Sequence, residues 1–78
     1  MRLHLYRGDT EVRTLEVDPD PPTAENIVEF EMPFKNELIA VSDSAVLIRT
    51  LAGEVKERFL FRGRSHDGGM FYVAPEER

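Results

Sequence analysis

Residues 3–17 read LHLYRGDTEVRTLEV and give the clearest structural signal in the chain. Apolar and polar residues alternate before Gly8 and Asp9, and the residues after this pair are rich in β-branched side chains. Both features are typical of half-buried strands. A glycine at the first position of a two-residue connection suits a type II′ turn. The segment therefore predicts a β-hairpin with its tip at Gly8 and Asp9.

The register of this hairpin requires an irregularity. A two-residue turn places Leu5 opposite Val12 on the inward face. Continued alternation from Val12 would then expose Leu15 to solvent. We expect a β-bulge near Arg13 or Thr14, because one extra residue there returns Leu15 to the buried face.

The rest of the chain also has the period of β-strands. A proline-rich loop at residues 18–23 cannot continue a ladder, because proline lacks the amide donor. Apolar runs separated by turn signals follow at residues 28–34, 38–41, 45–51, 55–61 and 70–74. The pattern predicts an all-β protein with six or seven short strands, a small antiparallel barrel or sandwich built from hairpins and a C-terminal meander. We expect residues 1–75 to form a single small domain and residues 76–78 a charged tail.

The N-terminal third offers an alternative fold. Residues 1–17, followed by Asp18-Pro19 and by Ala24-Glu25-Asn26-Ile27, resemble the opening hairpin and helix start of ubiquitin-like β-grasp domains. This resemblance implies a short helix near residues 23–32, where periodicity favours a strand. The chain has no terminal diglycine, so the resemblance does not imply conjugation.

Length and composition exclude several classes of protein. The chain has 78 residues, a formal net charge of −5 and no cysteine, which excludes a disulfide framework, a thiolate metal site and a cysteine nucleophile. No segment approaches the roughly 18 apolar residues needed to cross a bilayer, and the N-terminus lacks the apolar run of a signal peptide. We expect a cytoplasmic protein with no membrane partner.

The residue patterns predict no catalytic or metal site. Ser65, His66 and Asp67 are consecutive, whereas a hydrolase triad needs these residue types to converge in a chain of hydrogen bonds. His4 and His66 have no ligand spacing on a common element. Gly68-Gly69 lacks the Lys and Ser or Thr of a phosphate-binding loop. We therefore expect neither an enzyme nor a bound cofactor.

Charge is distributed unevenly along the chain. Residues 16–37 contain seven carboxylates and one lysine, a net charge of −6. A basic cluster lies near the last loop. The candidate partner-binding residues from these two clusters are Asp18, Asp20, Glu25, Glu29, Glu31, Arg58, Arg62, Arg64 and His66.

Opposite charge clusters without a catalytic constellation favour a non-enzymatic protein-binding module, a bacterial or phage-encoded adaptor or inhibitor. One alternative is a single-stranded nucleic-acid-binding protein in which the arginines hold phosphates and Phe71 or Tyr72 stacks a base. Another alternative is a structural subunit of a homo-oligomeric assembly.

Overall fold

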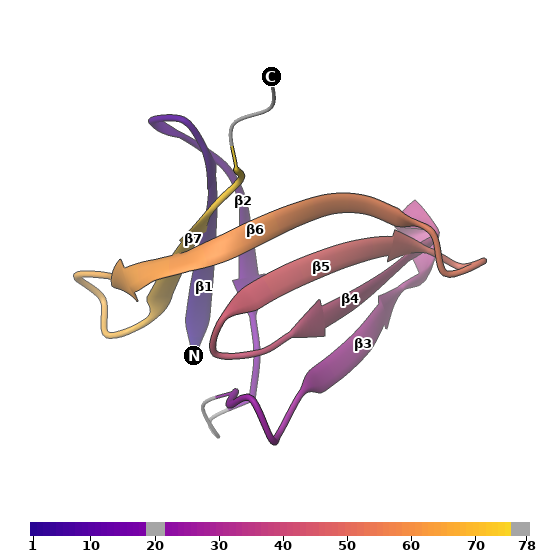
Figure 1. Ribbon diagram of the computed structural model, residues 1–78, viewed down its shortest axis with the longest axis horizontal. Coiled ribbons are helices and arrows are strands. Elements are labelled where there is room, and N and C mark those ends of the chain that lie inside the picture. Colours follow the sequence, from indigo (N-terminus) through magenta and orange to yellow (C-terminus); the bar gives the residue numbers. More distant parts are fainter. Residues whose placement is uncertain (19–21, 76–78) are drawn as a thin grey trace.

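The computed structural model describes residues 1–18 and 22–75, and the strands in these residues form one seven-stranded sheet (Figure 1). In chain order the strands are β1 (Arg2–Arg7), β2 (Thr10–Glu16), β3 (Val28–Met32), β4 (Glu37–Val41), β5 (Ala45–Thr50), β6 (Val55–Arg64) and β7 (Met70–Val73), with a 3-10 turn, η1 (Pro33–Lys35), between β3 and β4. Their order across the sheet is β2-β1-β7-β6-β5-β4-β3. The predicted all-β class and the C-terminal meander are confirmed.

The sheet curls into a half-barrel around β6. The first part of this strand pairs with β5, and its last residues pair with β7. Figure 1 shows β6 running across the molecule, with β1, β2 and β7 steeply inclined to β3, β4 and β5. One long strand thus belongs to both halves of the sheet, and its curvature brings their inner faces together.

The core lies between these inner faces. Its buried hydrophobic residues are Leu3, Leu5, Leu15, Val17, Ile39, Val41, Val46, Ile48, Phe59, Met70 and Tyr72. Tyr72 also links the two halves, because its hydroxyl donates a 2.8 Å hydrogen bond to the carbonyl oxygen of Ser42 in the β4–β5 turn. Burial raises the pKa of Tyr72 to about 12, so this hydroxyl stays protonated and able to donate.

The pairing of β1 with β7 is parallel, with Leu3 beside Met70 and Leu5 beside Tyr72. The other five strand pairings are antiparallel, so the expectation of a wholly antiparallel sheet was wrong at this one pair. Hydrophobic periodicity specifies the face that a residue takes, but the pairing of the first and last strands leaves no local turn signal.

The β-bulge of the first hairpin lies one residue earlier than expected. Leu5 pairs with Arg13 and Tyr6 with Glu11, which leaves Val12 as the extra residue. The predicted pairing of Leu5 with Val12 was therefore wrong, and Val12 is 46% exposed. The consequence expected of the bulge is confirmed, because Leu15 is buried.

The helix implied by the β-grasp resemblance is absent from the described part of residues 23–32. Residues 23–26 form a tight bend in which Thr23 and Asn26 exchange backbone hydrogen bonds, and β3 begins at Val28. Val28 and Phe30 face the core side, while Glu29 and Glu31 are exposed. The alternation of carboxylates with apolar residues therefore gives a strand, because a helix would mix them on one face.

The buried carboxylate of Glu37 in β4 binds side chains from β2, at one edge of the sheet, and from β6. Glu37 is 6% exposed, and its oxygens accept hydrogen bonds from Arg13 of β2 at 2.6 Å and from Lys56 of β6 at 3.1 Å. The hydrogen bond from Arg13 is the main reason why the pKa of Glu37 is lowered. The ion cluster satisfies the buried charge and fixes β2 over β4.

The β6–β7 loop packs tightly on β1, which gives a test of the parallel pairing. A Cβ at Gly69 would overlap the backbone carbonyl oxygen of Arg2. We expect Gly69→Ala to lower the free energy of unfolding by about 2 kcal/mol or more, in the range of overpacking substitutions. Urea denaturation followed by circular dichroism measures this loss. Gly63→Ala is the control, because its Cβ would meet only the Phe71 ring, at 3.3 Å; equal losses for both variants would contradict the packing described.

Candidate functional site

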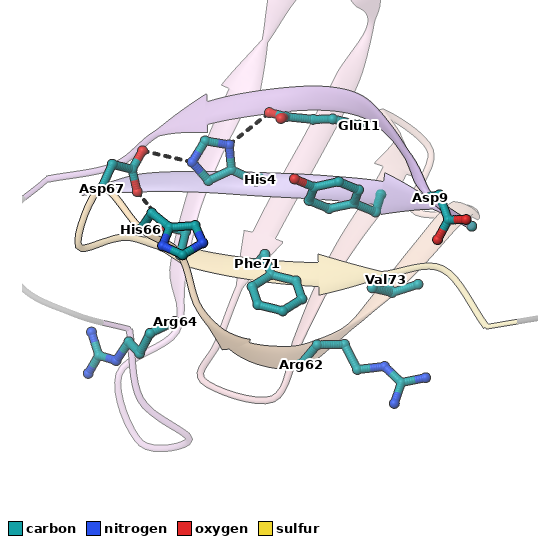
Figure 2. Close-up of a pocket in the computed structure, with 12 residues that line it drawn as sticks. His4, Asp9, Glu11, Arg62, Arg64, His66, Asp67, Phe71 and Val73 are labelled. Carbon is teal, nitrogen blue, oxygen red and sulfur yellow. Dashed lines mark hydrogen bonds and ion pairs between the residues drawn. The ribbon is translucent and has the colours of Figure 1, made fainter.

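A groove of about 840 Å³ lies on the outer face of β1, β7 and the end of β6 (Figure 2). It is lined by His4, Tyr6, Gly8, Asp9, Glu11, Arg62, Arg64, Ser65, His66, Asp67, Phe71 and Val73. The parallel register assembles it, because His4 lies beside Phe71 and Tyr6 beside Val73. These outward residues alternate with the core residues of the same two strands.

The floor of the groove is aromatic. The rings of Tyr6 and Phe71 are 6.0 Å apart between centroids and meet edge to face, at an interplanar angle of 76°. Both residues are partly exposed. Such a floor offers apolar contact area to a ligand, and its two rings lose little conformational entropy when the ligand binds.

Two arginines flank the Phe71 ring. A β-bulge in β6 leaves Arg62 without a partner residue and sets Gly63 opposite Phe71. The Phe71 ring lies over Gly63, where a Cβ would come within 3.3 Å of it. Figure 2 shows the side chains of Arg62 and Arg64 leaving β6 in opposite directions, with the Phe71 ring above the strand between them. The strand predicted over residues 55–61 thus extends through Arg62 and Gly63 to Arg64.

These two guanidinium groups have no ion-pair partner within residues 1–18 and 22–75. In the same part of the chain Arg2, His4, Arg7, Arg13 and Lys56 are all within 4.0 Å of a carboxylate. Arg62 and Arg64 are exposed and present their N–H donors to solvent. An exposed guanidinium next to an aromatic ring is typical of protein interfaces.

His4 forms the opposite wall of the groove, as a bridge between two carboxylates (Figure 2). Its Nδ1 is 2.8 Å from Oε2 of Glu11, and its Nε2 is 2.8 Å from Oδ2 of Asp67. A neutral imidazole has a single N–H, so hydrogen bonds to both carboxylates require the imidazolium form. The hydrogen bond to Glu11, followed by that to Asp67, raises the pKa of His4. A charged side chain therefore ties β1 to β2 and to the β6–β7 loop.

Asp67 organises that loop. Its carboxylate accepts hydrogen bonds from the Ser65 hydroxyl and from the backbone N–H of Gly69, the latter at 3.0 Å. These contacts and His4 hold the pKa of Asp67 well below its usual range, with the Ser65 hydrogen bond as the largest cause. Ser65 thus donates directly to Asp67, and His66 does not stand between them. This is not the Ser–His–Asp relay of a hydrolase.

The candidate residues taken from the sequence fall into separate places. Arg62, Arg64 and His66 line the groove, whereas Arg58 lines a second hollow with Leu47 and Lys56. The acidic candidates that the structure describes lie outside the groove: Asp18 follows β2, Glu25 is in the 23–26 bend, and Glu29 and Glu31 are on the edge strand β3. Asp20 is outside the described residues.

The sequence did not point to the other residues of the groove. His4, Tyr6, Glu11 and Asp67 join it through the pairing of β1 with β7, which no local motif announces. Phe71 is the exception, because an aromatic residue next to the arginine cluster suggested a stacking role.

Three comparisons, with protein-family models, with curated proteins and with solved structures, give no match for this chain. The described residues contain no group of three or more His, Cys, Asp or Glu arranged to hold a metal ion. None of their helical segments has the length and apolarity to cross a membrane.

The His4 bridge predicts a specific pH dependence. The folded state prefers the imidazolium, so the bridge contributes its full stability below the ordinary histidine pKa of about 6.5. This contribution is lost as the pH rises through the higher folded pKa of His4. We expect the free energy of unfolding of the wild type to fall as the pH rises from the ordinary histidine pKa through the folded pKa of His4, and we expect His4→Gln to lack this part of the decline. Urea denaturation at a series of pH values measures both.

Glu11→Gln provides the control for the bridge. It removes the larger of the two hydrogen-bonding influences on His4, so the midpoint of the His4 Hε1 resonance in an NMR titration should move to lower pH. A His4 midpoint that is unchanged by Glu11→Gln would contradict the bridge.

Proposed function

We propose that this chain is a non-enzymatic protein-binding module, an adaptor or inhibitor, and that it docks a partner protein in the groove on β1, β7 and β6. One observation carries the proposal: Arg62 and Arg64, which have no ion pair within the described residues, flank a partly exposed aromatic ring. Arginine and aromatic side chains are the residues that most often dominate binding energy at protein interfaces. The contact we propose places an apolar or aromatic side chain of the partner on Phe71 and its carboxylates against the two arginines.

The charge around the groove favours a protein over a polyanion. With His4 protonated, the groove is lined by three cations and three carboxylates. The cations are His4, Arg62 and Arg64. The carboxylates are Asp9, Glu11 and Asp67. Nucleic-acid sites depend on an excess of positive charge to release counterions, and this groove has none. A protein segment supplies a few carboxylates, which the two arginines can meet without the dense negative charge of a phosphate backbone.

The walls of the groove support binding by being held in place beforehand. The β6–β7 loop is fixed by Asp67, and Asp67 is fixed by His4. A surface that is already ordered loses less entropy when a partner docks. The acidic residues Glu29 and Glu31 lie on the far edge of the sheet, so we assign them to a second, separate contact.

Single-stranded nucleic acid is the second candidate occupant. The feature in its favour is the aromatic floor, since bases of any sequence stack on exposed Tyr and Phe rings. Asp9 and the net charge of −5 weigh against it. This candidate predicts binding that weakens steeply with salt and is lost on nuclease treatment.

The test of this proposal is affinity capture from a lysate of the source cells, before and after nuclease, with three immobilised proteins. We expect the wild type to retain a nuclease-resistant protein. Arg62→Glu/Arg64→Glu should retain at least about tenfold less of that protein, because two interface anchors are removed. Quantitative mass spectrometry of the bound fraction measures the ratio.

Arg58→Glu is the matched control, because Arg58 is also an exposed β6 arginine but lines the second hollow. It should keep the partner. Equal loss in Arg58→Glu and the double variant would show an effect of net charge and contradict the groove. Partners that disappear with nuclease would favour nucleic acid instead.

A further inference from the structure

The chain itself carries a protein segment with the chemistry that the groove accepts. Phe34 in η1 is fully exposed, which is unusual for so large an apolar side chain. Glu29 and Glu31 of the adjoining strand are exposed and have no ion-pair partner within the described residues. An aromatic side chain and two carboxylates thus project within six residues of the sequence.

The backbone holds this segment in a defined shape. β3 is an edge strand with β4 as its sheet neighbour, and the chain turns after it through η1 and Asn36. Asn36 has a φ of 54°, in the left-handed region that asparagine tolerates. Phe34 is therefore presented at the tip of a short turn and not on a long loop.

We propose that the groove is occupied by residues 29–34 of a second copy of this chain. Phe34 of one copy would lie on the Tyr6 and Phe71 floor of the next, and its Glu29 and Glu31 would face Arg62 and Arg64. The inference rests on the proposed function in one respect, that the groove is a protein-binding surface. Charge complementarity and the match of an exposed aromatic residue to an aromatic floor identify the occupant.

The contact is head to tail. In the order of the sheet β3 is at one edge, whereas the groove is formed by β1, β7 and β6 towards the other. Figure 1 shows β3 well apart from β1 and β7. Each copy therefore has one donor segment and one free groove, so the assembly either closes into a ring or grows as a chain. Its carboxylate–guanidinium contacts should weaken as salt is added.

Sedimentation velocity over a wide range of protein concentration at low salt tests the proposal. We expect the wild type to show a sedimentation coefficient that rises with concentration. Arg62→Glu/Arg64→Glu and Glu29→Lys/Glu31→Lys should each weaken association at least about tenfold, because like charges then face each other.

The decisive experiment is sedimentation velocity of an equimolar mixture of the two charge-reversed variants. In the mixture the unchanged groove of one variant meets the unchanged β3 of the other, and the reversed groove meets the reversed β3, so association should return towards the wild-type level. Unfolding or a change of net charge cannot produce this rescue. Arg58→Glu should associate like the wild type, and Phe34→Ser should weaken association without altering the circular dichroism spectrum.

A strictly monomeric wild type, or reversed variants that the mixture does not rescue, would overturn the inference. That result leaves the proposed function standing if the wild type captures another protein that Arg62→Glu/Arg64→Glu does not. Self-association with rescue, and no other partner captured, would instead identify the groove as a self-assembly surface alone.

Discussion

The hydrogen bonds between β1 and β7 are the constraint on which the rest of the structure depends. They join the first strand to the last in a parallel pair, and β6 then links this pair to the remaining antiparallel strands. On the inner face the pair contributes Leu3, Leu5 and Tyr72 to the core. On the outer face the same register creates the groove. Core and candidate site are therefore two faces of one strand pairing, and the pairing cannot shift by a residue without exchanging them.

Irregularities in the neighbouring strands give the groove its chemistry. The bulge at the end of β6 and the absence of a side chain at Gly63 let the Phe71 ring lie between two arginines. The bulge at Val12 restores the inward register of Leu15 while Glu11 stays within reach of His4. Bulges commonly redirect side chains next to functional surfaces. Here they combine with the His4 bridge to form a groove whose wall and floor are held by contacts within the chain.

Much of the fold could be predicted from local patterns. The Gly8-Asp9 turn, the loop around the prolines and the alternation of Glu29 and Glu31 with Phe30 each specify a strand or its end. The parallel partner of β1 could not be predicted, because strands far apart in sequence leave no turn chemistry. The residues of the groove divide in the same way, into those that a local pattern indicates and those that depend on strand pairing. The arginine cluster was evident from composition, but its association with Tyr6, His4 and Glu11 exists only after β7 is inserted beside β1.

The central claim is that the outer face of β1, β7 and β6 is a docking surface for residues 29–34 of a second copy of this chain. A series of ¹⁵N–¹H correlation spectra recorded on dilution of the wild-type chain maps any contact surface residue by residue. The account predicts concentration-dependent shifts confined to two patches, the groove around Tyr6, Gly63 and Phe71 and the donor segment 29–34. Shifts that avoid the groove, or that cluster on the second hollow around Arg58, would contradict it.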